Sequence, residues 1–93
     1  MPTILYINQK IHYVQSVNAN HTHLYLFVDG QTYRIQWVDC SDKLARAGQI
    51  EREYIEVSPS GYGLHWPLID EDLAITPLLQ QAERITAEND VTI

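Results

Sequence analysis

The chain has 93 residues, of which 45% are hydrophobic, and its twelve acidic and six basic side chains give a formal net charge of −6. This length suits one small domain around a single hydrophobic core. The sequence has no run of Lys and Arg, the residues that attract the phosphates of nucleic acids and of anionic lipids. The composition therefore argues against DNA binding by this chain alone and against a membrane surface as its partner.

Cysteine usage and the N-terminal segment suggest the compartment. The single cysteine, Cys40, excludes an internal disulfide and fits a reducing cytoplasm. The apolar stretch at residues 4–7 is too short for the core of a signal peptide or for a transmembrane helix. We expect a soluble cytoplasmic protein in which residues 1–85 form one domain and residues 86–93 form a frayed tail.

The clearest local pattern lies at residues 23–38, where two apolar and aromatic segments flank Asp29-Gly30. Asp-Gly favours a two-residue hairpin turn, because both central positions take positive φ. The resulting register pairs Val28 with Gln31 and Leu26 with Tyr33, and alternate side chains then face the core. The predicted core face consists of Leu24, Leu26, Val28, Tyr33, Ile35 and Trp37.

Further elements are predicted on both sides of this hairpin. Residues 11–18 favour a strand before it, and Ser41 and Gly48 favour the start and the end of a short helix after it. Residues 55–58 and 63–66 favour two more strands around a turn at residues 59–61.

The last predicted element is a helix that begins at Thr76-Pro77. Thr is expected to cap it, and Pro loses no needed N–H in its first turn. Its apolar stripe is expected to be Leu78, Leu79, Ala82 and Ile85. Strands followed by helical pieces predict an α+β fold: a small, mostly antiparallel sheet of four to five strands with two short helices packed on it.

The segment SPSGYGLHWPLIDEDL, residues 58–73, is unlike the rest of the chain. Its Gly-Tyr-Gly-Leu-His-Trp-Pro run from residue 61, followed by Asp-Glu-Asp-Leu from residue 70, resembles the bacterial domain-of-unknown-function 2442 family. The resemblance covers most of residues 11–80, while the first ten residues and residues 37–40 depart from the family pattern.

The resemblance implies a small α+β domain, which in some members precedes a helix-turn-helix domain. Stand-alone members resemble partners of small neighbouring proteins in a toxin–antitoxin-like arrangement. No catalytic residues are established for the family, so the resemblance implies none here.

An enzyme would use His65, oriented by one of the nearby carboxylates, as a general base. A convincing nucleophile and a phosphate-binding loop are missing from the sequence, since Gly-Tyr-Gly lacks the lysine and the following helix of such a loop. The interpretation we favour is structural: His65 and Trp66 alternate across a strand, one half-buried and one packed.

A metal site is a weaker hypothesis. His21 and His23 lie two residues apart, and His12 or an acidic residue could complete a ligand set, but this spacing alone is weak evidence. Cys40 lies beside Asp39 and Asp42, which should raise the pKa of its thiol and leave it structural. We predict no metal, no cofactor and no catalytic residue.

The acidic run at residues 70–72 is either a solvated turn or a docking surface for a basic partner, with the neighbouring tryptophan as an anchor. We expect a small acidic protein-binding module, antitoxin-like, that pairs with a small protein encoded next to it. The alternatives are a ligand-sensing regulatory domain without its DNA-binding output domain, and an uncharacterised enzyme. A homodimer is left open. The candidate partner-binding residues are Tyr62, His65, Trp66, Asp70, Glu71 and Asp72; the structural ones are Gly61, Gly63, Pro67, Asp29 and Gly30.

Overall fold

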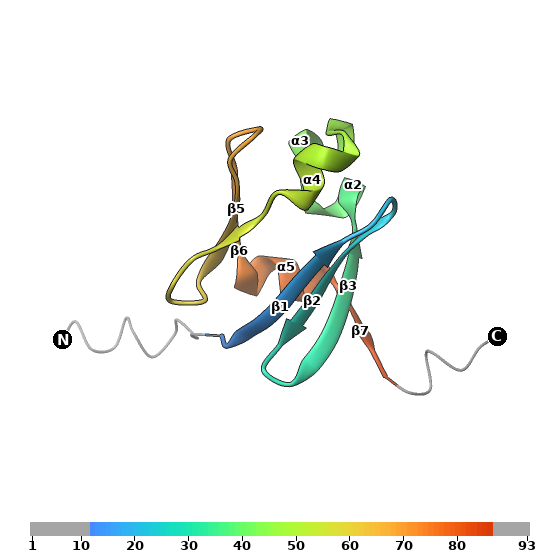
Figure 1. The fold of residues 1–93 in the computed structure, drawn as a ribbon. Coiled ribbons are helices and arrows are strands. Elements are labelled where there is room, and N and C mark those ends of the chain that lie inside the picture. The colour runs from blue at the N-terminus through green and yellow to red at the C-terminus, as the bar shows by residue number, and fades with distance from the viewer. Residues whose placement is uncertain (1–11, 87–93) are drawn as a thin grey trace.

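The structure, a computed structural model, describes residues 12–86. Within them the chain forms short strands and helices in alternating groups (Figure 1). In chain order these are β1 (Val14–Ala19), β2 (His23–Val28), β3 (Gln31–Gln36), α2 (Trp37–Cys40), α3 (Asp42–Arg46), α4 (Gln49–Glu53), β4 (Glu56–Val57), β5 (Gly63–Trp66), β6 (Glu71–Ala74), α5 (Ile75–Gln81) and β7 (Glu83–Ile85).

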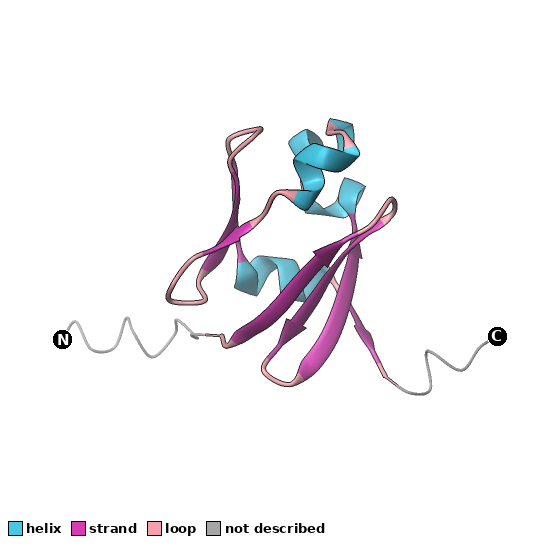
Figure 2. Cartoon of the chain, in the orientation of Figure 1, coloured by secondary structure: helices cyan, strands magenta, loops and turns pink. Residues whose placement is uncertain are grey.

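The strands form two antiparallel sheets rather than one. The first has the order β1-β2-β3-β7, and the second, which we call the small sheet, has the order β4-β5-β6. The predicted α+β class and the mostly antiparallel sheet of four to five strands are confirmed, and the small sheet adds three strands to them. Figure 2 shows the helices and the small sheet on one side of the four-stranded sheet.

The predicted hairpin is confirmed with its register. Asp29 and Gly30 have φ values of 53° and 78°, as the two-residue turn requires, and Leu26 lies opposite Tyr33. Alternation along β2 buries Leu24, Leu26 and Val28 completely. These side chains form the floor of the core.

The core joins both sheets to the helices. Trp37 at the start of α2 and Trp66 at the end of β5 meet edge to face, with ring centroids 6.5 Å apart and planes at 82°. The Arg52 guanidinium lies 5.2 Å from the Trp37 ring centroid and donates to the carbonyl oxygens of Leu44 and Ala45. Arg52 therefore satisfies backbone carbonyls of α3 while covering the buried tryptophan.

The last helix differs from the prediction at both ends. It begins at Ile75 with Ala74 as N-cap, so Thr76 lies inside its first turn and does not cap it. The Thr76 hydroxyl is instead hydrogen-bonded to His12. The helix ends at Gln81, and Ile85 belongs to β7, which pairs with β3. Pairing with the free edge of β3 satisfies backbone groups that a longer helix would have left at the sheet edge.

Three local assignments near the middle of the chain can be compared with the structure. Ser41 caps α3 as predicted, since its hydroxyl accepts from the backbone N–H of Leu44 at 3.1 Å. Gly48 is not the cap that ends that helix but the N-cap of α4, because α3 already ends at Arg46 with Ala47 as its C-cap. The acidic run is only partly a turn: Asp70 has φ 52° and turns the chain, whereas the next two acids begin β6.

The predicted frayed tail lies outside the described residues from residue 87 onward, as do residues 1–11. Within residues 12–86 no helix has the length and apolar character needed to cross a bilayer.

Candidate binding surface on the small sheet

The loop that joins β4 to β5 depends on one glycine. Gly61 has φ 70°, and a Cβ atom placed on it would lie 2.1 Å from the carbonyl oxygen of His12. Ser58 closes the loop: its hydroxyl oxygen accepts from the N–H groups of Tyr62 and Gly63 at 2.9 and 3.1 Å. The predicted structural role of Gly61 thus has a physical cause, close approach of two backbones at a positive φ. The loop holds Tyr62 with half of its surface exposed.

Alternation along strand β5 places the neighbouring side chains of His65 and Trp66 on opposite faces of the small sheet. The side chains of Leu64 and Trp66 point into the core, and the side chain of His65 points outward. Trp66 is fully buried, and its Nε1 donates to the carbonyl oxygen of Arg52 at 3.0 Å. The expectation that Trp66 anchors a partner is therefore corrected: it is a core residue with its one polar atom satisfied.

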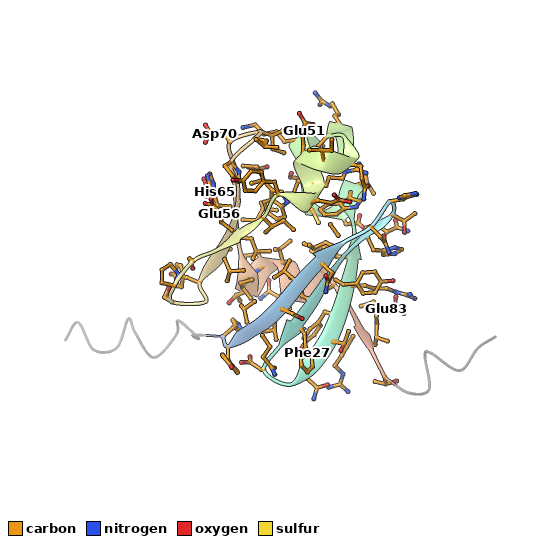
Figure 3. All side chains as sticks on the ribbon, viewed as in Figure 1. Phe27, Glu51, Glu56, His65, Asp70 and Glu83 are labelled. Atoms are coloured by element: carbon orange, nitrogen blue, oxygen red, sulfur yellow. The ribbon has the colours of Figure 1, made fainter. Side chains whose placement is uncertain are left out.

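Three polar side chains form a row across the outward face of the small sheet. Strand pairing places Glu56 opposite His65 and His65 opposite Asp72. His65 Nδ1 lies 2.8 Å from Asp72 Oδ1, and this pair is open to solvent, with 75% of the Asp72 side chain exposed. Figure 3 shows Glu56 and His65 on the side of the small sheet that faces away from the four-stranded sheet. The row is an imidazole between two carboxylates.

Beside this row, toward the loop that joins β4 to β5, the surface contains a groove of about 480 Å³. We call it the outer groove. Its apolar lining includes Val57 and Tyr62, which are 41% and 50% exposed, together with Pro59 and Leu73. Glu56 and Asp72 are the charged groups of its lining, besides the titratable His65. The groove therefore combines an apolar floor with an acidic rim.

The predicted site residues divide between this groove and other places. Tyr62, His65 and Asp72 line it, whereas Asp70 and Glu71 do not. The Asp70 carbonyl oxygen accepts from Lys43 Nζ at 2.9 Å, in the turn between β5 and β6. Glu71 Oε1 accepts from the backbone N–H of Asp72 at 3.1 Å. Neighbours in the sequence thus lie in different surroundings.

Sequence reasoning missed Glu56 and Val57 as groove residues. Both belong to the segment predicted as a strand, and the returning strand was predicted as well. Pairing the two segments around the turn would have placed Glu56 opposite His65. The strand register, and not the residue types, could therefore have identified Glu56 as a groove residue.

A second histidine–aspartate pair was also missed. His12 is 8% exposed, and its Nδ1 lies 2.7 Å from Asp29 Oδ2. Its Nε2 lies 3.1 Å from Thr76 Oγ1, and Asp29 Oδ1 accepts from the backbone N–H of Tyr13 at 2.8 Å. Both ring nitrogens are thereby engaged. This cluster, which we call the His12 clamp, joins the segment before β1, the hairpin turn and α5.

The described residues provide no support for a metal site at the histidines. His23 Nδ1 lies 2.7 Å from the hydroxyl of Thr22, and His12 is held in its clamp. Across residues 12–86 no three His, Cys, Asp or Glu side chains are gathered in a way that could hold a metal ion.

Cys40 is a partly buried free thiol. Its pKa is raised to about 12, mainly by burial and also by the charge of Asp39, while Arg52 opposes both effects. The predicted direction is confirmed, but desolvation and not the neighbouring acids is the main cause.

Comparison with known proteins places the chain in a family. The model of a family described as protein of unknown function (DUF2442) matches residues 14–84. The chain belongs to the DUF2442 family. The match runs from the start of β1 into β7 and includes the small sheet, the helices and the whole outer groove. No curated protein and no solved structure matches the chain.

Proposed function

We propose that this DUF2442 chain is a small acidic protein-binding module, antitoxin-like in pairing with a small basic protein, and that the outer groove is its binding surface. The observation that carries the proposal is the combination of an exposed aromatic and apolar floor with an acidic rim. Tyr62 and Val57 are the exposed apolar groups, and Glu56 and Asp72 are the rim.

Each half of this surface has a physical role. Tyrosine buries a large rigid ring at low entropic cost and is enriched among the residues that dominate binding energy. A carboxylate rim attracts cationic side chains and accelerates the encounter with a basic partner. The chain as a whole carries a net charge of −6, so its long-range field favours the same partner class. We therefore expect the partner to present Lys or Arg beside an apolar side chain.

The test is co-expression of the chain with the protein encoded next to it. We expect the two to co-purify and the chain to relieve any growth inhibition that the neighbour causes. Tyr62→Ala should weaken the complex about tenfold or more, because it removes the central apolar contact. The double variant Glu56→Gln with Asp72→Asn should mainly slow association, and its effect should vanish at high salt.

Matched controls come from exposed positions outside the groove. Ile50→Ala removes an apolar side chain that is 75% exposed on α4, and Asp42→Asn with Glu53→Gln removes the same number of charges from α3 and α4. Both should leave the affinity unchanged. No co-purification, or equal losses in groove and control variants, contradicts the proposal.

The volume of the outer groove favours a second candidate function. A hollow of about 480 Å³ lies in the range of small-molecule sites, which would suit a ligand-sensing regulatory domain. Enzymatic use of the His65–Asp72 pair ranks third, since the Ser58 hydroxyl beside it already accepts two backbone hydrogen bonds. A metabolite that binds the isolated chain in place of the protein partner would favour the second candidate.

A further inference from the structure

We propose that the outward face of the four-stranded sheet binds a second copy of this chain, so that the protein forms a two-fold dimer that leaves the outer groove free. We call this surface the dimer face. Its side chains come from alternate positions of β1, β2 and β3: Ser16, Asn18, Tyr25, Phe27, Thr32 and Arg34.

Strand alternation gives this face its aromatic character. Leu26 and Val28 are fully buried on the inner side, so Tyr25 and Phe27 between and beside them point outward. The buried core on the inner side includes Trp66 of the small sheet and residues of α2, α3 and α5. Within residues 12–86 these elements lie on the inner side, as Figure 2 shows. The outward rings of Tyr25 and Phe27 are partly buried among their strand neighbours. Figure 3 shows Phe27 at the lower end of the four-stranded sheet, away from the helices.

The dimer face has the shape that a two-fold interface requires. Such an interface uses the same patch on both copies, so the patch must carry both a projection and a hollow that receives it. A hollow of about 370 Å³ lies on this face, lined by Ser16, Asn18 and Thr32 beside the two aromatic rings. In a two-fold dimer this hollow and the aromatic rings that line it would lie against the same surface of the second copy.

Charge favours a second copy over a basic protein at this face. Strands β1 and β2 contain no Asp, Glu, Lys or Arg. The charged groups beside them on this face, Arg34 and Glu83, neutralise each other at 2.8 Å. Two chains that each carry a charge of −6 repel most strongly through their acidic surfaces, and contact through the uncharged strands of the dimer face lowers that repulsion.

The protection of the sheet edges also supports a dimer at this face. Natural sheets protect free edges with charges, proline or short strands. Strands β7, β4 and β6 are two to four residues long and each carries acidic side chains, whereas β1 has six residues and no charge. Among residues 12–86, the protective feature seen in β1 is a bulge between Val14 and Ser16. A second copy seated on the dimer face would border this edge.

The test is the molar mass of the isolated chain by sedimentation equilibrium between about 1 and 200 μM. We expect the mass to rise from 10.7 kDa to twice that value over this range. Phe27→Ala should weaken the dimer at least tenfold. Thr32→Glu adds a charge opposite Phe27 and keeps both aromatic rings, so it tests the same face if Phe27→Ala fails to fold. Tyr62→Ala, on the other sheet, should leave the dimer intact.

A mass of 10.7 kDa at every concentration overturns the proposal. A dimer that persists in folded Phe27→Ala and Thr32→Glu, or that Tyr62→Ala dissociates, also overturns it, since the contact would then lie elsewhere. The experiment uses the chain alone, so its outcome does not depend on whether a protein partner binds the outer groove.

Discussion

Two histidine–aspartate pairs of nearly equal length lie in opposite surroundings. His12 Nδ1 is 2.7 Å from Asp29, and His65 Nδ1 is 2.8 Å from Asp72. The His12 side chain is 8% exposed and its second nitrogen meets a threonine, whereas His65 is 35% exposed beside a groove.

The comparison separates a structural use of this chemistry from a binding use. A buried polar group with every partner in place stabilises the fold, and removing it leaves its partners unsatisfied. The same pair at the surface contributes little to stability because water competes for its hydrogen bonds. We therefore assign the binding role to the exposed His65–Asp72 pair and the structural role to the His12–Asp29 pair. The following variants test this assignment.

The largest expected effect is at the glycine that rests against the His12 clamp. Gly61→Ala should lower the free energy of unfolding by about 3 kcal/mol or more, because the new Cβ would overlap the His12 carbonyl at a positive φ. Gly63→Ala should cost less, since its Cβ would lie 3.0 Å from the carbonyl oxygen of Leu73 and its φ is not positive. Urea unfolding of both variants measures the difference. Equal stability of Gly61→Ala and the parent chain would contradict this account of the loop.

The second prediction compares the two histidines directly. His12→Ala should lower the free energy of unfolding by about 2 kcal/mol, because it empties the buried position of the imidazole and removes its hydrogen bonds to Asp29 and Thr76. His65→Ala should change it by about 0.5 kcal/mol or less. Thermal and urea unfolding at one pH measure both. A larger loss for His65→Ala would reverse the comparison.

The sequence predicted the parts of the molecule that depend on local rules. Asp29-Gly30 determines its hairpin through positive φ at two positions, and alternation then determines which side chains of β2 are buried. Ser41 caps its helix through a hydrogen bond three residues away. Each of these features needs only neighbours in the chain.

Long-range contacts explain what the sequence did not predict. Thr76 has the residue type of a cap, but the clamp uses its hydroxyl for His12, which is 64 residues away. The sequence of residues 83–85 has no strong strand pattern. These residues form a strand because they pair with the free edge of β3. The groove depended on a strand register that set Glu56 beside His65. Alternation along residues 63–66 placed Trp66 on the packed side as predicted, whereas the alternative that made it a partner anchor is wrong.

A smaller effect is expected at the thiol of Cys40, which is a third titratable group. Burial raises the pKa of Cys40 to about 12, above that of the thiol in the unfolded chain. The native state therefore holds this proton longer, so the associated stability is complete below the unfolded pKa and is lost as pH rises toward 12. Cys40→Ala should show a flatter decline of stability above pH 9 than the parent chain. In the native state at pH 8 the thiol should react slowly with a thiol reagent, and rapidly once unfolded. Fast native labelling would contradict the burial of this group.

The most direct test of the division is the footprint of the partner on the chain. Amide hydrogen exchange of the complex, compared with the free chain, shows which strands the partner protects. The account predicts new protection along β4, β5 and β6 around His65 and Tyr62, with no change at the His12 clamp. Protection confined to the clamp, or to the helices α2 to α4, would contradict the claim that the exposed pair marks the binding surface.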